Sequence, residues 1–299
     1  MAVVDISNTY QMSKSGEHID NTDVYNSNRN LLDNPFFTVN QRNFTSSTET
    51  NNIYSVDRWY IARGTGTISK TSNGITINGV GASRETTFQQ MIDCGDLTGR
   101  TVTLSVNDGG TIRQMAGEVP ARTASNNIFI RFTLRDGVSA FLYAMATSSA
   151  YAYMLQFQVN AGYTLDLRAA KIELGSYSTL ANDVPPNYGE ELKKCQYFFR
   201  RITVQDNGFI ALGWATSATA AQFPNILGTS PMRAKPSATP TGAVYVRDPS
   251  GTDHAVSSFT VEYDPVTVGL QANTSGLTAN TVARLRLGAG GRIDLSADL

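Results

Sequence analysis

Two histidines limit the nucleophilic chemistry that this sequence can support. His18 lies in a polar N-terminal stretch, and His254 lies in the segment GTDHAV, directly after Asp253. A serine hydrolase triad would have to use His254 with Asp253 or another acid, yet no GxSxG nucleophile elbow accompanies them. We therefore expect His254 to be a solvent-facing loop residue, and we expect no catalytic residue.

Metal and cofactor motifs are missing in the same way. The sequence has no HExxH, CxxC or EF-hand pattern, and its glycine-rich segments INGVGAS and RLGAGGR lack the Walker lysine and the strand-to-helix context. Acidic clusters at Asp93–Asp96 and Asp248–Asp253 offer oxygen ligands for calcium, although such residues more commonly shape turns. Cys94 and Cys195 are far apart in sequence, so we expect two free thiols. The sequence predicts neither a metal nor a cofactor.

Aromatic side chains are the remaining candidates for recognition. Aromatic faces, amides and hydroxyls are the groups that hold sugars, and the chain supplies Trp59, Trp214, Tyr151 and Tyr153. We expect each of these four to be a core residue, Trp59 in particular. The sequence does not identify which residues contact a ligand, and loops held by a rigid scaffold are the general expectation.

The composition indicates strands as the elements that position these groups. The chain is 41% hydrophobic and holds 13 Tyr and 13 Phe among many Thr, Ser, Asn and Gly, which is typical of strands and turns. Only 16% of residues are charged, and the net charge of -1 comes without basic runs, so we expect neither a nucleic acid partner nor an anionic membrane surface. A length of 299 residues favours two domains.

Alternating patterns dominate residues 30–180, separated by pairs such as Asn73-Gly74 and Asp136-Gly137 that close hairpins. In the segment NIFIRFTL we predict a strand with one buried face and one solvent-exposed face. The buried face has Ile128, Ile130, Phe132 and Leu134, and the exposed face has Arg131, Thr133 and Arg135. Residues 137–165 carry no charge, but their aromatic residues alternate around a TSS break. We therefore predict a hairpin there and no membrane insertion.

The same alternation resumes after Arg201 in segments such as GFIALGWA, GAVYVRD and VARLRLG, which predicts a second β domain. Residues 229–242 contain three prolines and are predicted to form an extended connection. Between the two β regions, charged residues over 185–201 predict a short helix, with Asn187 as its cap and Glu190 three residues on. One apolar stripe follows helical spacing: Tyr188, Leu192, Cys195 and Phe199. This stripe either packs on the protein's own sheets or meets copies from other subunits at a symmetry axis.

Several segments together resemble a recurrent module of phage tail fibres, head fibres and other virion-surface proteins. They are NLLDNPFF (Asn30–Phe37), DRWYI (Asp57–Ile61), AAKIELGSYST, YGEELKKCQYFFRRI, the final RIDLSADL and the upstream SGEHID. The resemblance covers most of the chain. It implies a jelly roll similar to a carbohydrate-binding module, joined by the helix to a C-terminal β domain, in a homotrimer with the helical stripe at its axis.

The expected organisation is all-β, with two antiparallel β-sandwich or jelly-roll domains joined by a short α-helix in a trimer. We expect an N-terminal arm at 1–28 that docks to other virion proteins, a jelly roll at 29–184, a linker helix at 185–201 and a C-terminal β domain at 202–299. Residues 1–20 lack a basic segment followed by an apolar one, so we expect no secretory signal and synthesis in the host cytoplasm. The short arm leaves open whether it docks to a tail, a baseplate or a capsid.

The expected function is host attachment from the virion surface, without enzymatic activity. The protein would be a virion fibre or adhesin that presents loops to a bacterial surface glycan or another receptor. One alternative is a structural capsid decoration or fibre adaptor without a host ligand. Another is a glycan-cleaving tail spike, because paired carboxylates from distant strands would leave no local motif.

Overall fold

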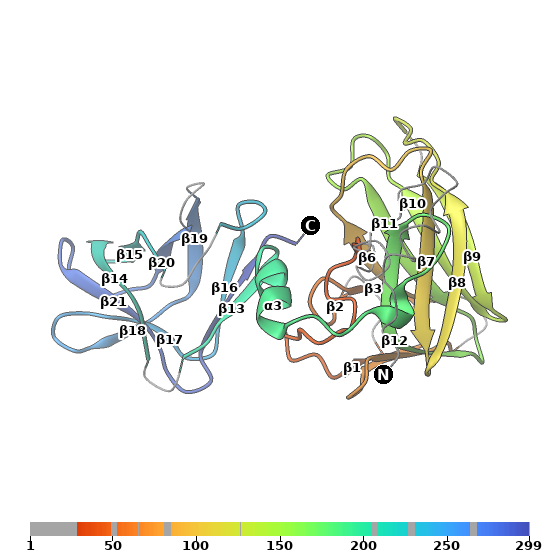
Figure 1. The fold of residues 1–299 in the computed structure, drawn as a ribbon. Helices are drawn as coiled ribbons and strands as arrows, with labels where there is room; N and C mark the ends of the chain where they lie inside the picture. Colours follow the sequence, from red (N-terminus) through yellow and green to blue (C-terminus); the bar gives the residue numbers. More distant parts are fainter. Residues whose placement is uncertain are drawn as a thin grey trace, which may run out of the picture. The chain divides into compact units, whose positions relative to one another are not determined.

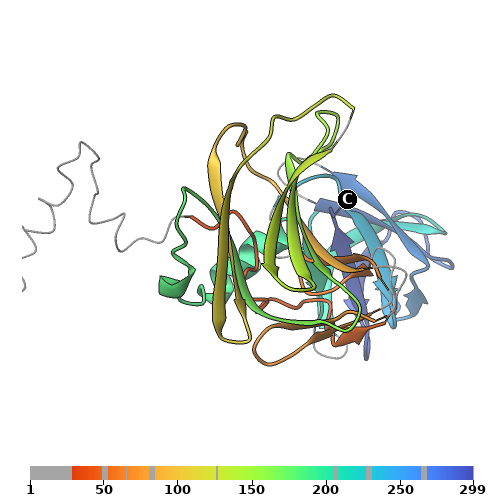
Figure 2. The same ribbon diagram turned by 90° about the vertical axis from the view of Figure 1, so that its right-hand side faces the viewer.

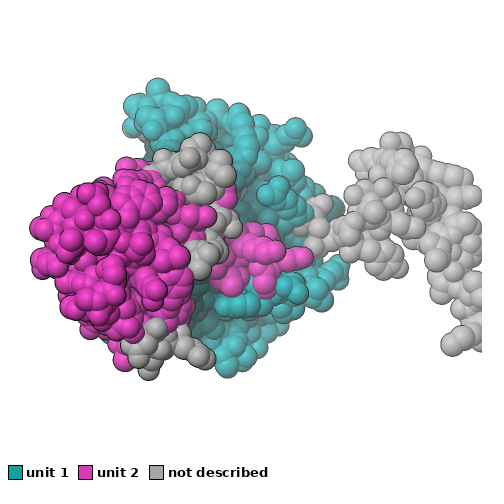
Figure 3. Space-filling view, turned by 90° about the vertical axis from the view of Figure 1, so that its left-hand side faces the viewer, with its two compact units in different colours: residues 1–188 teal, residues 189–299 magenta. Residues whose placement is uncertain are grey.

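The structure is a computed structural model that describes residues 29–48, 53–64, 66–80, 85–125, 127–204, 208–226, 231–263 and 268–298. The predicted arm at 1–28, including His18, lies outside the described residues. The chain divides into two compact units, residues 1–188 and 189–299, which Figure 3 shows in different colours. Strands dominate both units and pair antiparallel, as predicted for an all-β protein.

Unit 1 contains two six-stranded sheets (Figures 1 and 2). The first sheet has the order β1 (Ser46–Ser47), β4 (Thr67–Lys70), β5 (Ile75–Asn78), β12 (Thr164–Leu174), β7 (Thr101–Asp108) and β8 (Thr111–Glu118). The second has the order β2 (Ile53–Tyr54), β3 (Tyr60–Arg63), β6 (Thr86–Ile92), β11 (Tyr153–Val159), β10 (Val138–Ala144) and β9 (Ile128–Arg135). Buried side chains from both sheets form one apolar core, so unit 1 is a β-sandwich.

Trp59 lies in this core, as predicted. It is fully buried, and its ring stacks on Phe88 with the ring centroids 5.0 Å apart and an interplanar angle of 8°. The rings of Phe37 and Phe157 lie 5.2 Å and 6.1 Å from Trp59. Stacked aromatic rings bury large apolar areas, so this group stabilises the centre of the sandwich.

The segments NLLDNPFF and DRWYI fold against each other. The Asn34 side-chain amide donates hydrogen bonds to the carbonyls of Val39 and Asp57, at 2.8 and 3.0 Å, and the Trp59 indole donates to the Asn34 carbonyl at 3.2 Å. The buried Asp57 carboxylate accepts hydrogen bonds from the backbone and side chain of Gln41. These bonds satisfy polar groups that burial would otherwise leave without partners.

The uncharged stretch at 137–165 forms the predicted hairpin, with β10 and β11 paired from Val138↔Val159 to Ala144↔Tyr153. Among the described residues, no helix is long and apolar enough to cross a membrane. On the neighbouring β9, Phe132 is buried as predicted, but Ile128 at the start of the strand is exposed.

Two buried charged residues of β12, Lys171 and Glu173, bind the segment that follows this strand. The buried Lys171 ammonium donates hydrogen bonds to the hydroxyl of Thr179 and to the carboxylate of Asp183, both at 2.8 Å. Glu173 accepts hydrogen bonds from the backbone N–H and the hydroxyl of Thr179. These contacts order the segment that contains the 3₁₀ helix η1 (Leu180–Asn182), because buried charges require paired and hydrogen-bonded partners.

The predicted helix is present but shorter than 185–201. Helix α3 covers Tyr188–Gln196, and Phe199 lies on strand β13 (Phe199–Ile202). Phe199 pairs with Ser296 of β22 (Arg292–Ser296), so long-range strand pairing overrides helical continuation. The four predicted stripe residues therefore do not form one exposed helical face. Cys195 and Phe199 are buried, Leu192 is half-buried and Tyr188 is exposed.

Unit 2 contains a three-stranded and a seven-stranded sheet. The smaller has the order β13, β22 and β16 (Ser237–Thr241). The larger has the order β18 (Asp253–Ala255), β17 (Val244–Arg247), β21 (Val282–Leu287), β14 (Gly208–Ser217), β15 (Ala220–Phe223), β20 (Val268–Asn273) and β19 (Ser258–Tyr263). One apolar core joins side chains from both sheets. The proline-containing connection at 229–242 includes strand β16, which was not predicted. Pro240 fits in this strand because β16 is at the edge of its sheet, where a backbone without an N–H donor is tolerated.

Replacing Trp59 with alanine should destabilise unit 1 strongly, because it removes the stacking with Phe88 and leaves a cavity. We expect the free energy of unfolding to fall by about 3–5 kcal/mol, measured by urea unfolding of the full chain followed by circular dichroism. The control is Tyr177→Ala at a side chain that is 79% exposed, where we expect a change within about 0.5 kcal/mol. Equal losses in the two variants would contradict the placement of Trp59 in the core.

Candidate functional site

The structure separates the four aromatic candidates. Trp59, Tyr151 and Tyr153 are buried in unit 1, and the Tyr153 hydroxyl is occupied by the Leu97 backbone N–H and the Asp96 carboxylate. Trp214 of β14 is 45% exposed, so the prediction of a core position was wrong for this residue. The exposed surface around Trp214 therefore becomes the place to look for a binding site.

Strand β14 presents three large apolar side chains to solvent. Phe209 is 46% exposed and Leu212 is 58% exposed, in addition to Trp214. Strict alternation would place Leu212 and Phe209 on opposite faces. The pairing of β14 with β21 shifts between Phe209 and Ala211, so that Ile210 and Ala211 are both buried and the three large side chains share the outer face.

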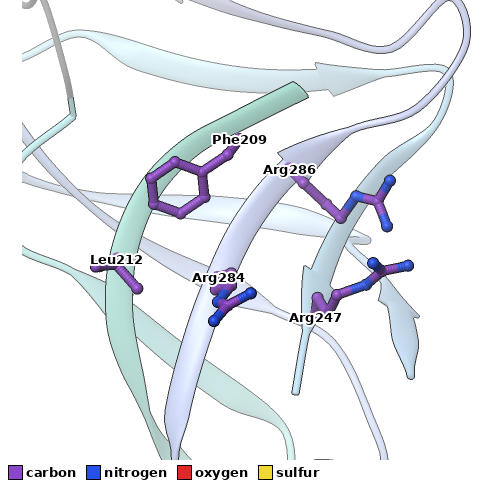
Figure 4. Close-up of a pocket in the computed structure, with 5 residues that line it drawn as sticks. All are labelled: Phe209, Leu212, Arg247, Arg284 and Arg286. Atoms are coloured by element: carbon purple, nitrogen blue, oxygen red, sulfur yellow. The ribbon is translucent and has the colours of Figure 1, made fainter. Parts of the chain in front are cut away.

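The neighbouring strands add arginines to the same face. Arg284 of β21 pairs in register with Leu212 of β14 on one side and with Arg247 of β17 on the other. Arg286 of β21 pairs with Phe209 of β14. These five residues line an open pocket of about 480 Å³, in which β14 supplies the apolar side and β21 and β17 supply the guanidinium groups (Figure 4).

One carboxylate holds two of the three arginines. Asp253 of β18 accepts hydrogen bonds from Nε and Nη2 of Arg247 at 2.8 and 3.0 Å, and from Nη1 of Arg286 at 2.9 and 3.2 Å. Burial acts to raise the pKa of Asp253, but the hydrogen bonds from Arg247 and the positive charges of Arg286 and Arg247 outweigh it, and the pKa lies below its ordinary value. Asp253 therefore stays ionised at neutral pH.

Arg284 differs from the other two arginines. Its side chain is exposed, and it makes no hydrogen bond or ion pair with the part of the chain that the structure describes. Directly opposed like charges on neighbouring strands repel each other. Arg284 and Arg247 form such a pair, which makes the pocket a place where an anion would be stabilised.

The prediction that His254 is a solvent-facing loop residue was wrong. His254 lies on β18, is partly buried and has Nε2 3.1 Å from Oδ2 of Asp248. The pKa of Asp248 lies well below its ordinary value. The hydrogen bond from the Ser250 hydroxyl is the largest cause, and the hydrogen bond with His254 is the second. Asp253, the acid considered beside His254 for a triad, is bound to arginines instead.

The acidic turns and the cysteines show ordinary structural roles. Asp248 accepts hydrogen bonds from Ser250 and from the backbone of Thr252 within its own turn, and no group of three or more His, Cys, Asp or Glu among the described residues is arranged to hold a metal ion. Cys94 and Cys195 are free thiols, as predicted. Burial, together with the charge of Asp93, raises the pKa of Cys94 to about 11, so its thiol stays protonated at neutral pH.

A second aromatic group lies on the outer face of β9 and β10 in unit 1. The ring centroids of Phe129, Phe141 and Tyr143 lie within 6.1 Å of one another. Phe129 is 51% exposed, whereas Phe141 is buried and Tyr143 is half-buried. The adjacent amides of Gln156 and Gln89 are buried and bind each other at 2.6 Å. Because these amides already have partners, we take the arginine pocket of unit 2 as the candidate site.

Sequence reasoning missed all five residues of this pocket. A usable signal was present in VARLRL, where Arg284 and Arg286 alternate with Leu285 and Leu287 and must share one face of a strand. No model of a known protein family matches the chain, and no curated protein matches it. The function of the protein is therefore inferred from the pocket and from the segments that resemble fibre proteins.

The ionised Asp253 should make unit 2 sensitive to acid. Because its folded-state pKa is lower than the ordinary value of 3.8, its contribution to stability is complete above pH 3.8 and is lost as the pH falls through the folded-state value. We expect Asp253→Asn to melt below the wild type at neutral pH, with the difference shrinking as the pH is lowered past that value. Calorimetric melting over a pH series measures this. A difference that stays constant with pH would contradict it.

Proposed function

We propose that this protein is a non-enzymatic attachment protein on the surface of a bacteriophage virion, and that its C-terminal unit binds a bacterial surface glycan. The observation that carries the proposal is the open pocket on the outer face of the seven-stranded sheet. Exposed apolar side chains rimmed by polar groups mark interaction sites. The resemblance of the quoted segments to fibre proteins supports the virion context.

The pocket has the two kinds of group that a sugar requires. Phe209 and Leu212 offer an apolar surface for the C–H face of a sugar ring. The guanidinium groups of Arg247 and Arg284 offer several N–H donors for hydroxyl or acidic oxygens. Because these residues lie on paired strands, the site is largely formed before a ligand binds, in contrast to the loops that we expected from the sequence.

In this proposal three copies assemble and residues 1–28 attach the trimer to another virion component. Of the predicted interface residues, Tyr188 and Leu192 have side-chain surface left for contacts between subunits, whereas Cys195 and Phe199 are buried within the chain. A solution mass near three times 32.3 kDa would support this assembly.

The purified full-length protein should bind at least one polysaccharide in a panel of bacterial capsular polysaccharides, O-antigens and teichoic acids. Leu212→Asp should abolish that binding, because the new carboxylate would pair with Arg284 and replace the apolar surface. Val184→Asp, at another exposed apolar residue of the chain, is the matched control and should bind normally. Biolayer interferometry measures both variants.

Two other results would favour different functions. Release of reducing ends from a bound polysaccharide would indicate a glycan-cleaving spike. Binding to virions without binding to any surface polysaccharide would indicate a capsid decoration or fibre adaptor and would contradict the proposal.

A further inference from the structure

We infer that the arginine pocket of unit 2 selects an acidic saccharide, with the ligand's carboxylate held between Arg284 and Arg247 and its sugar ring against Phe209 and Leu212. This inference rests on the proposed function, since it names the ligand class of the same site. Three features of the pocket support it: its charge, the donors that remain open and the position of its apolar side.

The charge of the pocket is positive and local. Three arginines line it, and no carboxylate is among the described residues that do so. Asp253 of β18 compensates part of the positive charge of Arg247 and Arg286. The nearby Asp248 binds Ser250 and His254 instead. The whole chain carries a net charge of -1, so this positive charge is not a general property of the protein.

The open donors lie side by side. Arg247 uses Nε and Nη2 on Asp253, and its Nη1 makes no hydrogen bond with a described residue. Arg284 lies directly opposite Arg247 on the next strand, and its whole guanidinium is available within the described structure. A planar carboxylate matches the fork of an arginine with two parallel hydrogen bonds. Such an anion would also relieve the repulsion between the two opposed cations.

The apolar side of the pocket restricts which anion fits. Leu212 and Phe209 lie on β14, directly opposite Arg284 and Arg286 of β21. A ligand that uses the whole pocket needs an apolar face and an acidic group a few ångströms apart, as a uronic or sialic acid residue has. The volume of about 480 Å³ is within the size range of small-ligand sites. A free phosphate or sulfate would use only the arginine side.

The test compares each uronate-containing capsular polysaccharide with its carboxyl-reduced form, which keeps the sugar rings and removes the charge. We expect wild-type protein to bind at least one acidic polymer and to lose about ten- to a hundredfold in affinity after reduction. Arg284→Gln should cause a loss of similar size on the acidic polymer. Because the Arg284 side chain is exposed and makes no hydrogen bond or ion pair with a described residue, this variant should keep the circular dichroism spectrum and melting temperature of the wild type.

Lys235→Gln is the matched control, since it removes one exposed positive charge of unit 2 outside the pocket. It should bind like the wild type, and an equal loss in both variants would show nonspecific charge attraction and overturn the inference. Equal binding of acidic and reduced polymers would overturn the acidic ligand but leave glycan binding intact. Equal binding of dextran sulfate would show a general anion site and also overturn it. Binding to no polysaccharide would overturn the proposed function together with the inference.

Discussion

The structure of the pocket depends on one carboxylate shared by two arginines. Asp253 binds Arg247 and Arg286 at the same time and so fixes two guanidinium groups at the edge of the seven-stranded sheet. A third arginine, Arg284, lies on the same face, opposite Arg247 and two residues before Arg286 on β21, without a compensating acid in the described structure. All three arginines are therefore carried by paired strands, and Asp253 orients two of the three guanidinium groups. A preorganised cationic surface of this kind binds anions at low entropic cost.

The backbone places the apolar half of the pocket beside this charge. Without the shift in pairing after Phe209, that side chain would point into the core, and only Leu212 and Trp214 of the three large apolar side chains would face solvent. A local irregularity of β14 thus converts an alternating strand into one with a continuous apolar outer surface. Strand bulges commonly redirect side chains near functional sites. Here the redirected Phe209 and its neighbour Leu212 lie beside arginines from strands that are distant in sequence.

Much of the fold could be predicted from the sequence because alternation and turn residues are local signals. They located the hairpin of β10 and β11, whereas the core position of Trp59 was expected from its place in the segment DRWYI. The end of α3 was missed because Phe199 pairs with β22 almost a hundred residues later. The pocket was missed for the same reason: the alternation of VARLRL predicts a shared face for Arg284 and Arg286, but not which strands lie on either side. Pairing partners and register are long-range properties.

The proposed acidic-saccharide site can be tested by a crystal structure of the full-length protein with a uronic-acid-containing oligosaccharide. We expect a carboxylate within hydrogen-bonding distance of Arg284 and Arg247, with the sugar ring against Phe209 and Leu212. An oligosaccharide bound at another surface, with the arginine pocket empty, would show that the pocket is not the saccharide site.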